Sequence, residues 1–190
     1  MEENNFIKYY DLENYIFGKV STQFHKSGFL SAFDFFAIII WKANRAKSKI
    51  SKRILGRGYN NLNDGVKALT NDIYKCTEDK KRLECLIKKW GFRLPMSSAI
   101  LTVLYPDTFT VYDIRVCETL NVKNNLDNIT NFDKLWSSYL EYKNKVFNAV
   151  EGNLSLRDSD RYLWGESFYD QLNNDISIGF TKEITLYYHS

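Results

Sequence analysis

The sequence predicts an all-α protein, and three observations support this prediction. Apolar residues recur at spacings of three, four and seven along most of the 190 residues, which is the period of a helix. Helices and strands do not alternate as they do in parallel-sheet folds, and no repeat or linker divides the chain. A composition of 44% hydrophobic and 26% charged residues is typical of a packed globule. We therefore expect one helical domain.

The N-terminal half is expected to contain four helices, each with apolar side chains on one face: 6–24, 32–46, 62–76 and 78–90. The first has a break near Gly18 and ends before Gly28. Ser31 and Thr77 are the expected N-caps of the second and fourth helices. The second is apolar on nearly all sides as far as Lys42, so we expect it to be the central buried helix.

The C-terminal half is expected to contain four further helices: 97–105, 113–120, 132–150 and 156–172. Ser97 or Ser98 opens the first of these, and Pro106 stops it. Residues 109–112 are expected to be an extended connection. Asp113 follows them as the expected N-cap of the next helix.

Few residues are available for metal, redox or histidine chemistry. Cys76, Cys85 and Cys117 are odd in number and contain no CxxC pair, which argues against a disulfide framework, a zinc site or an iron–sulfur cluster. His25 and His189 leave little for a Ser-His-Asp triad. We therefore expect no cofactor and no metal, and chemistry that depends on carboxylates, hydroxyls and amines.

The sequence favours a soluble, cytoplasmic protein. The apolar run over residues 32–41 is interrupted by Asp34 and followed by Lys42, so it is too short to cross a bilayer. Residues 1–5 lack the basic start of a signal peptide.

The net charge of +3 is unevenly distributed. No acidic residue occurs between Phe35 and Asn63, whereas seven basic residues do: Lys42, Arg45, Lys47, Lys49, Lys52, Arg53 and Arg57. A second basic group follows: Lys80, Lys81, Arg82, Lys88, Lys89 and Arg93. We expect a positive face that attracts a polyanion, with an affinity that falls as salt rises. A solvated helix face is the alternative explanation for such runs.

One stretch carries a motif. Residues 91–101 read GFRLPMSSAIL, and residues 109–116 read FTVYDIRV. Together they resemble the helix-hairpin-helix superfamily of DNA glycosylases, in which a hairpin precedes an alanine-containing helix and an aspartate begins the next helix. In this sequence the hairpin corresponds to residues 91–95, the alanine to Ala99 and the aspartate to Asp113.

The resemblance covers residues 31–120, because residues 35–54 look like the first long helix of that superfamily. Two positions depart from its pattern. Arg93 and Pro95 lie near the two usual hairpin glycines, and Ser97 occupies the position at which lyase-competent members have lysine. With no amine at that position, Schiff-base chemistry is unsupported and direct attack by water is expected.

The superfamily implies two helical lobes with a DNA-binding cleft between them. We expect one lobe to contain residues 1–44 and 113–175, and the other to contain residues 45–112. Apolar residues alternate near the C-terminus, which predicts that residues 176–190 form an extended tail.

The resemblance assigns catalysis to Asp113. Removal of a base from a deoxynucleotide generates positive charge on the sugar, and a carboxylate held close to the anomeric carbon stabilises that transition state. The alternative is that Asp113 is an ordinary helix cap, which is by far the commoner role of an aspartate at this place.

Other side chains are expected to bind DNA or the extruded base. Phosphate contacts are assigned to Lys42, Arg45, Lys49 and Arg93, and Asn44 is expected to fill the gap that a flipped nucleotide leaves. Ser97, in the hairpin region, completes the expected DNA-binding set. The expected base pocket is aromatic, and its members are Trp41, Tyr105, Tyr112 and Trp164. For each of these aromatics, a place in the hydrophobic core is the alternative. The mixed charged and aromatic segment 157–164 is expected either to close the pocket or to form an ion-paired helix face.

These features together predict a monomeric, monofunctional DNA glycosylase that excises a modified or mismatched base from duplex DNA. Base excision repair and defence against phage DNA with modified bases both fit this activity, and the sequence does not reveal which base is removed. Two alternatives remain open: a non-enzymatic helix-hairpin-helix DNA-binding module, and a small protein-interaction domain.

Overall fold

The computed structural model describes residues 6–180, and every element in that range is helical. The all-α prediction is therefore confirmed for these residues. The α-helices are α1 (Leu12–Asn14), α2 (Ser21–Ser27), α3 (Ala32–Ala43), α4 (Lys47–Leu55), α5 (Leu62–Lys75), α6 (Asp79–Glu84), α7 (Leu94–Leu104), α8 (Ile114–Thr119), α9 (Phe132–Asn148) and α10 (Leu156–Ser177). Short 3-10 segments are η1 (Phe6–Tyr9), η3 (Asn44–Ala46) and η5 (Leu126–Asn128), and π-helical segments are η2 (Tyr15–Val20) and η4 (Cys85–Lys89).

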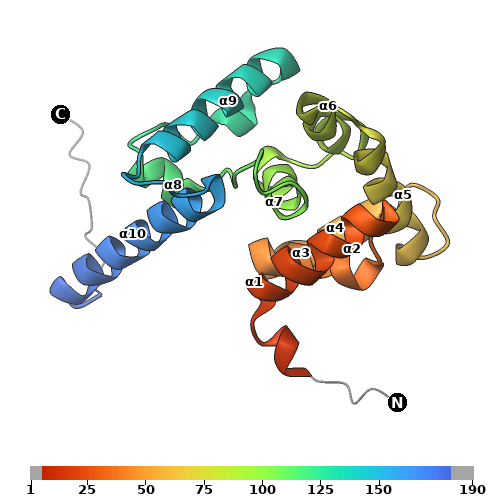
Figure 1. Cartoon of the computed structure of the whole chain (residues 1–190), viewed down its shortest axis with the longest axis horizontal. Coiled ribbons are helices and arrows are strands. Elements are labelled where there is room, and N and C mark those ends of the chain that lie inside the picture. The colour runs from red at the N-terminus through yellow and green to blue at the C-terminus, as the bar shows by residue number, and fades with distance from the viewer. Residues whose placement is uncertain (1–5, 181–190) are drawn as a thin grey trace, which may run out of the picture.

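Helix α7 lies at the centre of the molecule, between α1–α5 on one side and α8–α10 on the other (Figure 1). Its residues from Ser97 to Leu104 are all buried. The sequence predicts the helix that begins at Ala32 as the central one, and this is wrong. Helix α3 packs against α5 and α7, but its outer face leaves Phe33 and Ile40 exposed. Apolar side chains on all sides of α3 therefore do not mean that all sides are covered.

The N-terminal helix is interrupted twice. The Asp11 side chain accepts a hydrogen bond from the Asn14 amide at 3.1 Å and begins a new helix, a break that the sequence analysis missed. The expected disturbance near Gly18 takes the form of the π-helical segment η2. Gly28 then ends α2 in the left-handed conformation, with φ at 77°, as a helix C-terminus prefers.

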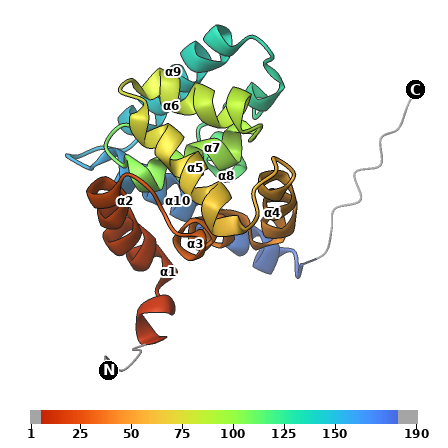
Figure 2. The same cartoon turned by 90° about the vertical axis from the view of Figure 1, so that its right-hand side faces the viewer.

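Residues 35–54 do not form the single long helix that the resemblance implies. Ala43 leaves the helical conformation with φ at −162°, and the chain continues through η3 into α4. Helix α4 lies beside α3 and α5 (Figure 2). The turn at Ala43 lets α4 bury Ile50 and Ile54 in the core, which a straight continuation of α3 would not do.

Two arginines hold the hairpin that precedes α7. One lies in α4 and the other in the turn that follows α4. Arg53 donates to the Gly91 carbonyl and Arg57 to the Lys89 carbonyl. Their guanidinium groups also lie over the rings of Phe92 and Trp90, at 5.6 and 4.5 Å. The hairpin is therefore attached to α4 and the turn after it by arginines that donate hydrogen bonds to its carbonyls.

Helix α7 begins earlier than expected. The sequence predicts a start at Ser97 or Ser98, but the helix begins at Leu94, with Pro95 in its first turn. Proline fits that position because its missing amide would have no partner there. Ser97 and Ser98 therefore lie inside the helix. Thr77 is likewise not a cap, because α6 begins at Asp79 after Glu78.

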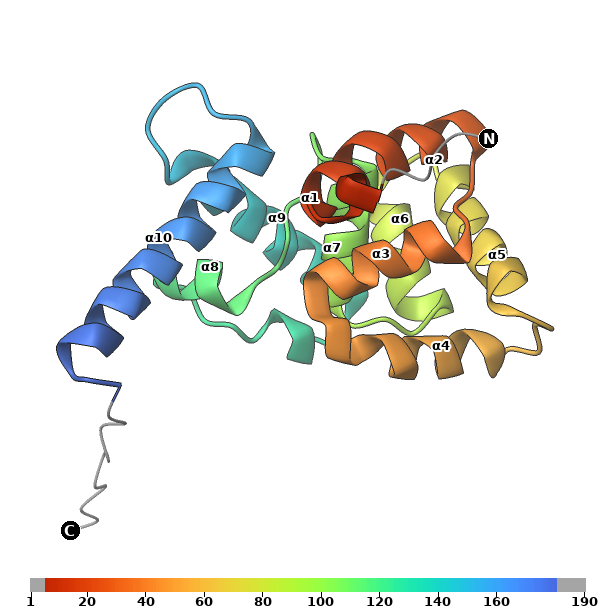
Figure 3. The same cartoon turned by 90° about the horizontal axis from the view of Figure 1, so that it is seen from below.

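The C-terminal third packs around the buried extended segment 109–112. The Tyr139 hydroxyl, from α9, donates to the Thr110 carbonyl, and the Tyr142 hydroxyl donates to the Val111 carbonyl. Helix α10 follows and extends away from the other helices beyond α8 (Figure 3).

Helix α10 continues to Ser177, so the expected extended tail is wrong at its first residues. Phe168, Leu172 and Ile176 follow one another at four-residue spacing, and this helical period prevails over the alternation. Residues 181–190 of the expected tail lie outside the described residues. Between residues 6 and 180, no helix has the length and apolar character that a membrane span requires.

Candidate active site

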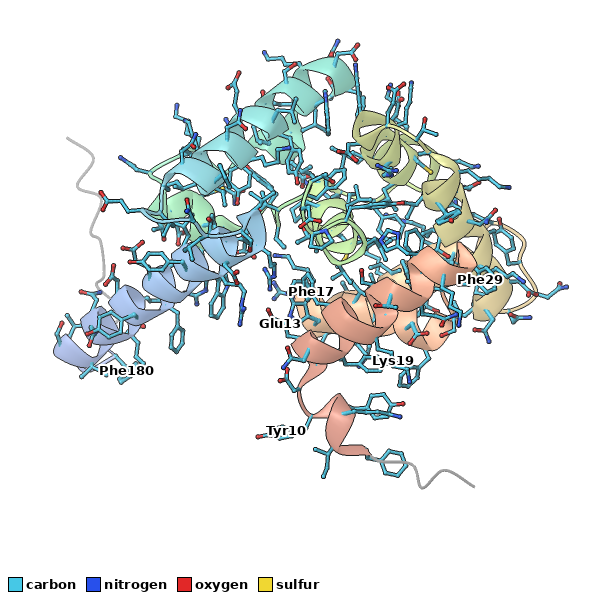
Figure 4. All side chains as sticks on the ribbon, in the orientation of Figure 1. Tyr10, Glu13, Phe17, Lys19, Phe29 and Phe180 are labelled. Carbon is cyan, nitrogen blue, oxygen red and sulfur yellow. The ribbon has the colours of Figure 1, made fainter. Side chains whose placement is uncertain are left out.

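A pocket of about 340 Å³ lies between the first helices and α10, a size typical of small-ligand sites. It is lined by Glu13, Trp41, Lys42, Val111, Asp113, Arg157, Asp160, Arg161 and Trp164. Figure 4 shows Glu13 and Phe17 on the side of the first helix that faces α10. Segments from four distant parts of the sequence therefore meet at one polar site.

Asp113 lines this pocket and also caps α8. Its Oδ1 accepts a hydrogen bond from the Arg115 amide at 3.0 Å, which confirms the predicted N-cap. Its Oδ2 accepts a hydrogen bond from the Lys42 ammonium. The side chain remains 18% exposed, so the carboxylate is anchored at a helix N-terminus and is still open to the pocket.

Lys42 has a carboxylate partner that the sequence analysis did not predict. The sequence assigns it to DNA phosphates, and in the structure it lines the pocket and pairs with Asp113. It lies in the last turn of α3, next to the extended segment that delivers Asp113. A cation therefore lies against the candidate catalytic carboxylate in the free protein.

Two of the four predicted pocket aromatics line the pocket. The Trp41 ring meets Phe17 edge to face at 5.5 Å, and the Arg157 guanidinium lies 5.4 Å from its centre. The Trp164 ring stacks in parallel on Phe168 at 5.9 Å and is 45% exposed. The pocket therefore has two indole walls, one on α3 and one on α10.

Tyr105 and Tyr112 belong to the core and not to the pocket, as the alternative for these residues predicts. Tyr105 packs against Phe24, and the Arg82 guanidinium lies 4.0 Å from its ring centre. Tyr112 is 1% exposed, and its hydroxyl accepts a hydrogen bond from the Leu126 amide at 3.1 Å. Burial raises the pKa of Tyr112 to about 12.

Arg157 connects α10 to the first helix. Its Nη2 pairs with Glu13 Oε1 at 2.6 Å, and its Nη1 pairs with Asp160 Oδ2 at 2.7 Å. The guanidinium lies over the Phe17 ring at 4.5 Å, so it is stacked as well as paired. The segment 157–164 thus both closes the pocket and forms ion pairs, so the two alternatives for it are not exclusive.

Asp160 is the most enclosed charged group at the site, with 3% of its surface exposed. Burial raises the pKa of this carboxyl to about 6, because the loss of water outweighs the attraction of Arg157 and Lys42. The nearby Asp113 carboxylate acts in the same direction as burial. Asp160 and Glu13 were not among the predicted site residues; the only available signal was the mixed charge of the segment around Asp160.

The remaining predicted DNA-binding residues lie apart from the pocket lining. Arg93 Nε pairs with Asp127 Oδ2 at 2.5 Å, and Asn44 Oδ1 accepts a hydrogen bond from Lys47 Nζ at 2.7 Å. Ser97 is fully buried within α7, and its hydroxyl has no hydrogen-bond partner among residues 6–180. Ser97 therefore cannot meet DNA at the surface.

The second basic group is largely neutralised by acidic neighbours. The ion pairs are Lys80–Asp133, Lys81–Glu84, Arg82–Asp79, Lys88–Glu84, Lys89–Asp72 and Arg93–Asp127. Within the first group, Arg53 and Arg57 bind carbonyls of the hairpin. The positive field is consequently smaller than the sequence suggests.

Arg45, Lys49 and Lys52 are exposed basic residues of η3 and α4, whereas Lys47, which is also exposed there, donates to Asn44. The first three are spaced by four and three positions, as neighbours on one helix face are. None of the three has an ion pair with another residue of the described range. We call these three residues the basic stripe.

Within residues 6–180, no group of three or more His, Cys, Asp or Glu side chains is arranged to hold a metal ion. Comparison of the chain with protein-family models, with curated proteins and with solved structures finds no match.

Proposed function

We propose that this chain is a monofunctional DNA glycosylase that removes a modified or mismatched base by hydrolysis. The observation that carries the proposal is the position of Asp113: its carboxylate is fixed at the start of α8 and faces a pocket with two tryptophan walls. The resemblance of residues 91–116 to the helix-hairpin-helix superfamily supports the same activity. Repair and defence against modified phage DNA both remain compatible with it.

The chemistry of the pocket fits the excision of a base. Indole faces accept any nucleobase, so Trp41 and Trp164 can hold an extruded base by stacking. The departing base leaves positive charge on the sugar, and the fixed Asp113 carboxylate stabilises that charge without reorganising. Water then attacks the anomeric carbon, and an abasic site remains.

Lys42 has a role in this scheme before the base leaves. Its ammonium holds the Asp113 carboxylate in the free protein. A DNA phosphate at the mouth of the pocket offers the ammonium a second anionic partner, and its movement toward that phosphate uncovers Asp113 for the sugar. The cation would thus connect DNA binding to the exposure of the catalytic group.

DNA is proposed to lie between two lobes, residues 1–44 with 113–175 and residues 45–112. The Glu13–Arg157 ion pair supports the first lobe, because it joins the N-terminal helix to α10. The basic stripe supplies cations for the phosphates. In this scheme a monomer binds the duplex, and Asn44 remains the proposed wedge.

The proposal is tested by incubating the protein with genomic and phage DNAs and identifying released bases by mass spectrometry. We expect release of at least one base, and an Asp113→Asn variant that binds the same DNA but releases it about 100-fold or more slowly. Unchanged release by Asp113→Asn would overturn the assignment of Asp113.

The second candidate is a non-enzymatic helix-hairpin-helix DNA-binding module. It is favoured by the engagement of both Asp113 oxygens, which is what a helix cap with an ion-pair partner would show. Salt-sensitive DNA binding with no base released from any DNA would support this candidate. The protein-interaction alternative predicts instead that DNA binding shows no response to salt.

A further inference from the structure

We propose that Asp160 is a second catalytic carboxyl, the general acid that protonates the departing base. The inference rests on the proposed glycosylase function and adds a residue that neither the sequence motif nor the resemblance assigns. Asp160 comes from α10 and lines the same pocket as Asp113.

The geometry leaves one oxygen of Asp160 available to a ligand. Oδ2 is held by Arg157 Nη1 at 2.7 Å. Oδ1 receives no hydrogen bond from a residue within the described range, and it is not among the fully enclosed side-chain atoms that lack a partner. Oδ1 is therefore the oxygen that the pocket can reach.

The two carboxyl groups of the pocket are prepared for different tasks. Asp113 accepts hydrogen bonds at both oxygens, one from an amide and one from an ammonium, so neither oxygen is without a donor in the free protein. Asp160 is almost fully enclosed and has one free oxygen. Two carboxyl groups in one site, one held by two donors and the other enclosed with a free oxygen, match the arrangement of a stabilising carboxylate beside an acid.

Several charged and titratable groups face Asp160 from the elements around it. They are Lys42 from α3, Asp113 from the start of α8, Arg157 from α10, Glu13 from α1, and Tyr139 and Tyr142 from α9. Glu13 is neutralised by Arg157 and Arg161, and burial raises the pKa of both tyrosines, so they remain protonated at neutral pH. Burial places the pKa of Asp160 at about 6, a value suited to proton donation near neutrality.

The proposed step conserves atoms and charge. The bond between the anomeric carbon and the base nitrogen breaks, and its electron pair goes to the base. The base takes the proton from the Asp160 carboxyl and leaves as a neutral molecule. Asp160 becomes a carboxylate paired with Arg157, while water adds to the sugar cation beside Asp113 and releases a proton to solvent.

The test is the pH dependence of single-turnover base release, measured on the DNA substrate that the panel of genomic and phage DNAs identifies. For the wild-type protein, we expect the rate to fall as pH rises above about 6, because Asp160 then loses its proton. In Asp160→Asn the amide oxygen can still accept from Arg157, but the proton donor is lost. At pH 6 we expect the rate of Asp160→Asn to be lower than that of wild type by a factor of about 100 or more, and we expect the variant to lack the pH dependence.

The control is Asp170→Asn, which removes one carboxylate from the exposed part of the same helix and should leave the rate unchanged. An Asp160→Asn variant with the wild-type pH profile, or with a rate within about threefold of wild type, would overturn the role of Asp160. Thermal unfolding by circular dichroism establishes that each variant is folded.

A second measurement does not depend on a variant that folds. Carbon-13 NMR of the aspartate carboxyl groups in the wild-type protein should show one that titrates near pH 6, and a full set of carboxyl groups ionised above pH 5 would refute the inference. The absence of base release from every DNA by the wild-type protein would instead reject the proposed function itself. The two failures are therefore distinguishable.

Discussion

The Lys42 ammonium and the Asp113 carboxylate form an ion pair between residues that are 71 positions apart in the chain. The pair places an amine in the same pocket as the proposed catalytic carboxylate. The sequence analysis expected no amine nucleophile, because Ser97 replaces the lysine of lyase-competent members, and Lys42 is an amine that it did not consider for this role. The hydrolytic mechanism and an amine mechanism make opposite predictions at this residue.

We predict that no covalent complex forms when the protein is treated with borohydride in the presence of abasic DNA. Lys42 is held by Asp113 in the free protein and, in the proposed complex, by a DNA phosphate, so in neither state is its nitrogen directed at the sugar. Denaturing gel electrophoresis detects the reduced complex if it forms. A trapped complex that disappears in Lys42→Arg would show that Lys42 attacks the sugar, and the monofunctional assignment would then be wrong.

The basic stripe should determine the salt dependence of DNA binding. Replacement of Arg45, Lys49 and Lys52 by alanine is predicted to reduce the slope of log affinity against log salt by roughly 3, since each phosphate contact contributes about 0.9. Fluorescence anisotropy of a labelled duplex at several salt concentrations measures this slope.

The matched control removes the same amount of charge from the second basic group. Lys80, Lys81 and Lys88 are paired with Asp133 or Glu84, so their replacement by alanine should leave the slope nearly unchanged. Equal losses in both triple variants would mean that net charge, and not the stripe, determines binding.

Local interactions explain what the sequence could predict. Ser31 and Asp113 were correctly identified as N-caps because each bonds an amide two or three residues ahead. The ion pairs of Glu84 with Lys81 and Lys88 were equally readable, since they follow the three- and four-residue spacing of a helix. The sequence analysis did not subtract these acidic partners from the basic residues, and doing so would have reduced the positive field that it expected.

The candidate site was predictable only in part, because its members meet through tertiary packing. Of the four aromatics predicted to hold a base, Trp41 and Trp164 line the pocket and Tyr105 and Tyr112 do not, and residue type alone does not separate the two pairs. The pairing of Lys42 with Asp113 depends on how α3 packs beside the extended segment, and no local pattern encodes this.

Substitution of Gly65 by alanine tests the packing of α4 against α5. A Cβ on Gly65 would lie 2.3 Å from the Ile54 Cγ2 atom and 3.1 Å from the Tyr59 ring. Ile54 is fully buried and cannot move away freely, so Gly65→Ala should lower the free energy of unfolding by about 1–3 kcal/mol.

The opposite sign is expected for Gly165→Ala in α10, where a Cβ would meet no atom within 4 Å. Alanine in a helix interior should raise the free energy of unfolding there by about 0.5–1 kcal/mol. Urea unfolding followed by circular dichroism measures both changes. Unchanged or raised stability in Gly65→Ala would contradict the close approach assigned to Gly65, and a loss of stability in Gly165→Ala would contradict the open space assigned to Gly165.

The protonation of Asp160 also predicts how stability depends on pH. Its pKa is about 6 in the folded protein, against about 3.9 in an unfolded chain, so the folded state holds a proton that the unfolded state has lost between these values. The resulting stabilisation is fully present below about pH 4 and is lost as pH rises through about 6. Asp160→Asn lacks this contribution at every pH, so its unfolding free energy, relative to wild type, should increase from pH 4 to pH 7. Urea unfolding at four pH values measures the difference, and the other titrating groups cancel in it. A difference that stays constant with pH would show that folding does not raise the pKa of Asp160, and the proposed acid would then have no proton to donate near neutral pH.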